Sequence, residues 1–157
     1  MSTTIVNQTF RTDQVDVRGP RFAAWVTTAV LLSVLVVSAF SPPAAAVILA
    51  AQAAVFAIGA AGGPRHHPYG RIFATVVSPR LGPVTEREPV PPLKFAQLVG
   101  LLFAVVGVAG FAFGAPLLGV TATALALAAA FLNAAFGICL GCMLYPLVTR
   151  LRRPRGA

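Results

Sequence analysis

The sequence predicts an all-α protein: a bundle of four transmembrane helices with a short interfacial helix in a cytoplasmic connector. Two observations indicate this fold class. Hydrophobic residues make up 57% of the 157 residues and charged residues only 10%, whereas a soluble domain carries about 25% charged residues. The apolar residues also lie in uncharged runs of about 18 or more, the length at which a helix crosses a bilayer.

The first two spans are predicted at residues 22–40 and 44–62, after a polar cytoplasmic N-terminal segment at residues 1–21. Ser41 and Pro43 lie between the two spans. Serine caps helix N-termini, and proline fits the first turn of a helix because its missing N–H has no partner there. These residues therefore predict a tight turn followed by a new helix.

A polar, proline-rich connector is predicted at residues 63–94. Apolar side chains recur within it at helical spacing, at Tyr69, Ile72, Phe73 and Val76. This pattern indicates a short amphipathic helix that begins at Pro68 and lies flat at the lipid headgroups. A docking surface for a soluble partner is the alternative.

The last two spans are predicted at residues 95–114 and 117–148, followed by a basic cytoplasmic tail at residues 150–157. About 30 residues of helix would reach about 45 Å, whereas the hydrocarbon core is about 30 Å thick. We therefore expect the last run to tilt, to extend past the headgroups or to break, with Asn133 and Pro146 as the irregular points.

The distribution of charge predicts the topology. All 12 Lys and Arg residues lie in the N-terminal segment, the connector and the tail, and none lies in the tight turns at residues 41–43 and 114–116. The positive-inside rule then places both termini and the connector in the cytoplasm, with the bundle in the plasma membrane. This topology also explains the net charge of +8, so we expect contacts with anionic lipid headgroups and no nucleic-acid partner.

The two cysteines of the chain form a CxxC pair, Cys139 and Cys142, near the end of the last apolar run. Residues at i and i+3 share one helix face, and the predicted topology places both sulfurs at the cytoplasmic side. The cytosol keeps thiols reduced, so a permanent structural disulfide is not expected. In thiol exchange one cysteine attacks and the other resolves; we assign attack to Cys142, which lies nearer the water, and resolution to Cys139. The pair is expected near a helix C-terminus, where the helix dipole disfavours a thiolate.

Other interpretations of the pair remain open, and with them the question of whether the protein is an enzyme. The cysteines could be inert packing residues of a membrane scaffold or accessory subunit, or they could line the path of a carrier for a small sulfur species. Together with His66 and His67 they could form a tetrahedral zinc site. Otherwise the two histidines are expected to face water or headgroups.

Small and polar residues surround the pair. Gly137 and Gly141 would let another helix, a quinone ring or a partner's loop approach the sulfurs. Such small-residue faces are also compatible with a homo-oligomer. Asn133 is costly inside a span unless it is hydrogen-bonded, and Gln52 and Gln97 are the candidate partners. No cofactor follows from these residues, although a quinone or zinc would be compatible with them.

Several classes of function are disfavoured. No acidic or basic residue lies inside any predicted span, which argues against an ion-coupled transporter or proton pump. The chain has no glycine-rich phosphate loop, metalloprotease motif or serine-hydrolase elbow. Acid–base chemistry would have to come from Glu86, Glu88 or the connector histidines.

Four segments carry a family resemblance: YGRIF at 69–73, SPRLGP at 78–83, EREP at 86–89 and NAAFGICLGCMLY at 133–145. Together they resemble the bacterial integral membrane family DUF4395, from about Arg18 to Tyr145. The resemblance implies a four-helix membrane protein with a C-terminal CxGC and no assigned reaction. It also favours a thioredoxin-like or rhodanese-like cytosolic partner. Our leading hypothesis is therefore a membrane component of thiol–disulfide exchange or sulfur transfer.

Overall fold

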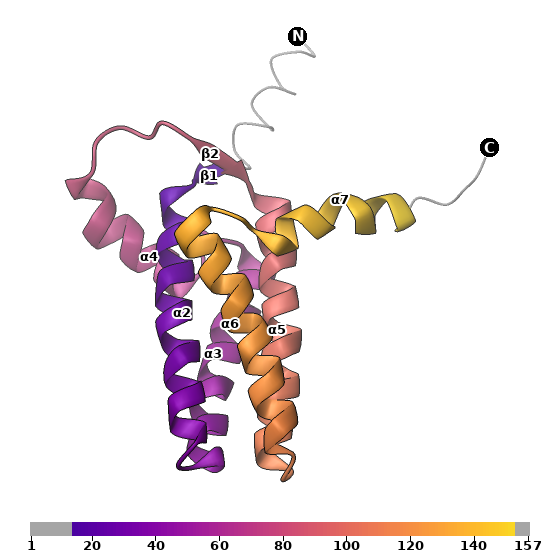
Figure 1. The fold of residues 1–157 in the computed structure, drawn as a ribbon. Helices are drawn as coiled ribbons and strands as arrows, with labels where there is room; N and C mark the ends of the chain where they lie inside the picture. Colours follow the sequence, from indigo (N-terminus) through magenta and orange to yellow (C-terminus); the bar gives the residue numbers. More distant parts are fainter. Residues whose placement is uncertain (1–13, 153–157) are drawn as a thin grey trace.

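The computed structural model describes residues 14–152, which form six α-helices, four of them upright in a bundle (Figure 1). The bundle helices are each long and apolar enough to cross a membrane: α2 (Arg18–Ser38), α3 (Pro42–Gly62), α5 (Val90–Ala112) and α6 (Pro116–Phe136). Helices α2 and α5 each pack against both α3 and α6. The predicted all-α, four-helix class is therefore confirmed.

The turns between the bundle helices follow from local sequence. The Ser41 side chain accepts a hydrogen bond from the Ala44 N–H at 3.3 Å, and Pro42 occupies the first turn of α3. Gly63 ends α3 with a φ of 75°, and Gly114 turns the chain between α5 and α6 with a φ of 78°. Both angles lie in a region that glycine adopts without steric cost.

Glycines also set the spacing between the bundle helices. A Cβ atom at Gly107 would lie 2.6 Å from the Leu49 side chain of α3, and one at Gly110 would lie 2.5 Å from the Gly119 backbone of α6. Close backbone approach of this kind drives helix association in lipid. The outward faces carry large exposed apolar side chains, among them Leu32, Val36, Val47, Leu102 and Leu125, as expected for a lipid-facing surface.

The end of the bundle opposite the tight turns carries the remaining elements (Figure 1). Strand β1 (Gln14–Asp16) pairs antiparallel with β2 (Arg87–Pro89), with Val15 opposite Glu88. This pairing joins the chain just before α2 to the chain just before α5. It thereby holds Glu88 at the polar end of the bundle.

The connector contains the predicted short helix. Helix α4 (Pro68–Ile72) begins at Pro68 and continues as a π-helical turn, Phe73–Val77, and a 3-10 turn, Ser78–Arg80. Of its apolar residues, Phe73 is buried against Gly19 of α2, whereas Ile72 and Val76 are exposed.

The fourth apolar stretch differs from the prediction. Helix α6 ends at Phe136 rather than near residue 148, because Gly137 adopts a left-handed φ of 68° and donates its N–H to the Asn133 carbonyl at 3.0 Å. A new helix, α7 (Leu140–Arg152), then leaves the bundle sideways and packs on α5 (Figure 1). The irregular point is thus neither Asn133 nor Pro146, which lies inside α7. A left-handed glycine is a common way for a helix to end.

Candidate functional site: a CxxC pair at the start of α7

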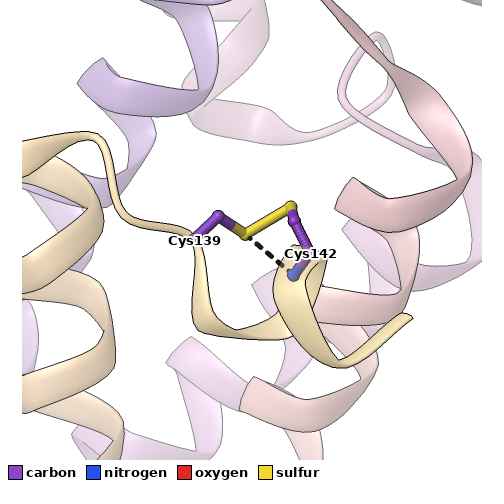
Figure 2. The surroundings of a disulfide bond; sticks show 2 residues. All are labelled: Cys139 and Cys142. Atoms are coloured by element: carbon purple, nitrogen blue, oxygen red, sulfur yellow. Dashed lines mark hydrogen bonds between the residues drawn. A yellow bond between two sulfur atoms is a disulfide. The ribbon is translucent and has the colours of Figure 1, made fainter. Parts of the chain in front are cut away.

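The two cysteines lie where α7 begins. The Cys139 carbonyl accepts the Met143 N–H at 3.0 Å, and its Sγ atom accepts the Cys142 N–H at 3.2 Å (Figure 2). Cys139 therefore acts as the N-cap of α7, with its sulfur in the place of a serine hydroxyl. The two sulfurs are joined in a disulfide, and the two Cα atoms are 5.2 Å apart.

This position corrects the prediction that the pair lies near a helix C-terminus. The break at Gly137 makes the CxxC the beginning of a helix instead of the end of one. A helix N-terminus carries partial positive charge and unpaired N–H donors, which stabilise a thiolate. The electrostatic effect of the helix on Cys139 is thus opposite in sign to the one expected from the sequence.

A hollow of about 500 Å³ opens beside the disulfide. One part of its wall comes from β2 and the start of α5, and the other comes from the turn into α7; the lining residues are Glu88, Pro89, Pro92, Leu93, Gly137, Ile138, Cys139, Cys142 and Met143. Both cysteines are partly exposed. The sulfur atoms are therefore next to a space that a second molecule could enter.

Two charged side chains flank this hollow. Burial raises the pKa of the half-buried Glu88 carboxyl above its usual value; the positive charge of Arg21 opposes this shift, and the negative charge of Glu86 adds to it. The Arg21 guanidinium lies against the turn, because a Cβ atom at Gly137 would be 2.9 Å from its Nη2 atom. A protonatable carboxyl and a cation thus lie beside the CxxC. The sequence indicated Glu88 as one of the two connector acids, with Glu86, and it gave no signal for Arg21.

Gly141 and Gly137 have different roles. Gly141 is buried, and a Cβ atom there would lie 2.5 Å from Cα of Ala96, so α7 contacts α5 closely at this point. Gly137 forms the turn. Gly141 thus provides the close contact with helix α5. The space beside the sulfurs is the hollow described above.

Asn133 does not pair as predicted. Within residues 14–152 its side chain makes no hydrogen bond to Gln52 or Gln97. Gln52 instead accepts a hydrogen bond from the Tyr69 hydroxyl at 2.8 Å. The Asn133 backbone carbonyl contributes to the turn that ends α6.

The two histidines also separate. His66 is exposed, with Nδ1 2.8 Å from the Gly62 carbonyl, as expected for a solvent-facing residue. The expectation of exposure is wrong for His67, which is only 3% exposed. The part of the chain that the structure describes brings no three His, Cys, Asp or Glu residues together in a way that could hold a metal ion. The zinc alternative, with both histidines and both cysteines, therefore has no geometric support.

The fold and the site define a multi-pass helical membrane protein with a CxxC pair at a helix N-terminus on its polar end. Over residues 15–150 the chain matches the family model described as Domain of unknown function (DUF4395), and it belongs to that family. The resemblance predicted from the sequence is thereby confirmed. Neither the curated proteins nor the solved structures contain a match to the chain.

Proposed function

We propose that this protein is a membrane-bound component of thiol–disulfide exchange, in which the Cys139–Cys142 pair alternates between disulfide and dithiol. The observation that carries the proposal is the 3.2 Å hydrogen bond from the Cys142 N–H to Cys139 Sγ at the start of α7. The thiolate is the species that attacks a disulfide, and this N–H and the helix N-terminus stabilise it. The hollow beside the pair gives a partner access.

The hydrogen bond favours Cys139 as the attacking residue and Cys142 as the resolving one, the reverse of the assignment made from the sequence. The Cys139 thiolate attacks one sulfur of a partner's disulfide, forms a mixed disulfide and expels the other partner sulfur as a thiolate. Cys142 then loses its proton and attacks Cys139 Sγ, which forms the internal disulfide and releases the partner's second thiolate. Two electrons pass to the partner, and a partner dithiol drives the same steps in reverse.

We assign to Glu88 the role of accepting the proton that Cys142 loses, and the hollow that both residues line supports this assignment. A carboxyl whose pKa is raised by burial is a better proton acceptor than an ordinary one. Water in the hollow is the alternative acceptor. Glu88 therefore assists the resolving step, whereas the attack by Cys139 does not require it.

The sidedness of the site follows from charge. The basic residues Arg18, Arg65, Arg71, Arg87 and Lys94 lie in or next to the elements at the polar end of the bundle, together with the CxxC pair. By the positive-inside rule this end faces the cytoplasm, with both termini. The exchange partner is then a cytosolic thioredoxin-like or rhodanese-like protein, and the basic side chains contact anionic headgroups of the plasma membrane.

The test is to trap the mixed disulfide in inverted membrane vesicles that contain the full chain. Cys142→Ser keeps the attacking thiol and lacks the resolving one. It should therefore accumulate a stable mixed disulfide with a thioredoxin that lacks its own second cysteine and whose remaining cysteine is activated as a thionitrobenzoate disulfide, because thionitrobenzoate leaves and no thiolate remains to reverse the step. Cys139→Ser is the matched control and should accumulate at least tenfold less. A membrane-impermeant thiol reagent should label the reduced pair in inverted vesicles and leave it unlabelled in right-side-out spheroplasts.

Three other outcomes would argue against the proposal. Two equally unreactive cysteines would favour the scaffold alternative. A persulfide on Cys139 after incubation with thiosulfate and a rhodanese-like donor would favour sulfur transfer. Labelling only from the outside would overturn the cytoplasmic assignment of the site.

A further inference from the structure

Helix α7 has one apolar face that stays exposed within the described residues 14–152. The residues of this face recur at the spacing of a single helical stripe, and we call them the leucine stripe: Leu140, Leu144, Leu147 and Leu151. Their side chains are between 39% and 79% exposed. A different face of α7 contacts α5 through Gly141 and Tyr145, whose ring centroid lies 6.0 Å from that of Phe95. The leucine stripe is therefore available to a partner outside the described chain.

The leucine stripe points away from the polar end of the bundle. Successive residues of a helix are about 100° apart, so the last three leucines of the stripe lie about 140–180° around α7 from Cys142. Cys142 lines the hollow beside the disulfide together with Glu88 of β2, and β2 lies at the polar end, just before the start of α5 (Figure 1). The opposite side of α7 therefore faces the level of the transmembrane helices.

Helix α7 crosses α5 where the charged start of that helix gives way to its apolar outer surface. The contact residues of α5 are Phe95 and Ala96. Lys94, the last charged residue of α5, directly precedes them, and Leu98, which is 44% exposed, follows them. Helix α7 also runs across the direction of the bundle helices rather than along it (Figure 1). Both features are typical of a helix that lies flat at the boundary between headgroups and acyl chains.

Basic residues flank the leucine stripe. Arg150 and Arg152 are both exposed, and they stand about 100° to either side of Leu151. Long basic side chains place their stems along an apolar surface and their charged groups at the headgroups. Helix α7 contains no acidic residue. An arginine on each side of the stripe therefore fits a membrane surface that carries anionic lipid, whereas a protein groove would have to supply acidic groups on both sides.

We propose that α7 is an interfacial helix. Its leucine stripe is buried among the acyl chains of the leaflet at the polar end of the bundle, and Arg150 and Arg152 bind anionic phospholipid headgroups. The outer surface of the bundle and the leucine stripe then form one continuous contact with lipid, and the Cys142 side of α7 faces water. This proposal concerns the location of α7 and does not depend on the thiol chemistry proposed above.

The test measures the depth of single tryptophans in nanodiscs that each hold one full chain. Trp25→Phe removes the one native tryptophan and leaves both cysteines intact. In this background Leu147→Trp reports on the leucine stripe, and Thr149→Trp, on the Cys142 side of α7, is the matched control. Phospholipids brominated near the glycerol end of their acyl chains should quench Leu147→Trp at least twofold more than Thr149→Trp. Aqueous acrylamide should show the opposite order.

Hydrogen exchange tests the contribution of charge. Exchange of the α7 amides should be at least fivefold slower in nanodiscs that contain phosphatidylglycerol than in phosphatidylcholine alone. The double variant Arg150→Gln, Arg152→Gln should remove this difference while the bundle helices stay protected. The same exchange rate in both lipids, or a lipid effect that survives in the double variant, would overturn the proposal.

The tryptophan data distinguish the other occupants of the leucine stripe. Equal quenching of both tryptophans by acrylamide would show that the stripe lies in water. Protection of Leu147→Trp from acrylamide without quenching by brominated lipid would show that protein covers the stripe. Either result would overturn the proposal and would leave the thiol exchange to be judged by its own trapping experiment.

Discussion

The substitution Gly141→Ala should detach α7 from the bundle and disturb the CxxC pair. A Cβ atom at Gly141 would lie 2.5 Å from Cα of Ala96 and 2.6 Å from its Cβ. Carbon atoms pack at about 3.5–4.0 Å, so α7 must move by about 1 Å, since the Ala96 backbone belongs to a bundle helix. Overpacking of this kind typically costs about 1–3 kcal/mol. At about 1.4 kcal/mol for each factor of ten, this is a roughly 5- to 150-fold weakening of the docked state.

Hydrogen–deuterium exchange of the α7 amides in detergent micelles measures this loss. An undocked helix of 13 residues is only marginally stable in isolation, so exchange of α7 should accelerate by that factor while the bundle helices stay protected. The control is Gly82→Ala, because a Cβ atom at Gly82 meets nothing within 4 Å. Unchanged exchange of α7 in Gly141→Ala, or equal acceleration in the control, would refute the reasoning.

Three further perturbations test His67, Glu88 and Gly137 at the polar end of the bundle. Burial lowers the pKa of His67, so the unfolding temperature should be highest above the ordinary histidine pKa of about 6.5 and should fall as the pH drops below that value. His67→Gln should remove this acid sensitivity, and His66→Gln should keep it. The pKa of Glu88 is raised, so its contribution to stability should be fully present below the ordinary glutamate pKa and be lost as the pH rises through the raised value. Glu88→Gln should flatten this part of the curve of unfolding temperature against pH, and Glu86→Gln should retain most of it. Gly137→Ala should lower stability by about 1–2 kcal/mol in denaturant titrations, because alanine is strained at a φ of 68°; an unchanged midpoint would contradict the role of this turn.

The bundle was predictable because its signals are local. The first three uncharged apolar runs each became one helix, and the fourth supplied the last bundle helix, α6. The turns contain residues whose conformational preferences need no tertiary context, such as the Ser41 cap and the prolines at Pro42 and Pro116. The short connector helix likewise begins at Pro68. These features depend on hydropathy and backbone sterics alone, so one sequence is sufficient to find them.

The different environments of the two histidines were not predictable, because they depend on contacts between segments that are far apart in the sequence. His66 and His67 are identical residues at adjacent positions, and no local rule distinguishes them. His67 is buried because α3 carries a glycine at position 59, and the imidazole ring occupies the space that a Cβ atom would fill. Gln97 of α5 meets the ring there. This contact joins residues far apart in the chain, and no periodicity in the sequence indicates it.

The position of the CxxC pair also depends on a contact between distant segments. A glycine in an apolar run is compatible with helix packing, as at Gly107, and with a left-handed helix end, as at Gly137. What separates the two outcomes is the space available to the next segment. Gly141 lets the segment after Gly137 lie against Ala96, so a new helix can form there. The prediction failed at this point because the decisive contact lies on a different helix.

This break decides the chemistry of the two sulfurs. In one continuous helix Cys139 and Cys142 would have backbone N–H groups that are already paired within the helix, and the nearby C-terminal carbonyls would repel a thiolate. After the break, the Cys142 N–H belongs to the first turn of α7, has no carbonyl partner there and donates to Cys139 Sγ. The same CxxC sequence is therefore an unreactive pair within a continuous helix and a candidate exchange site once Gly137 adopts a positive φ. It follows that a variant which straightens residues 136–140 should lose thiolate reactivity even with both cysteines present.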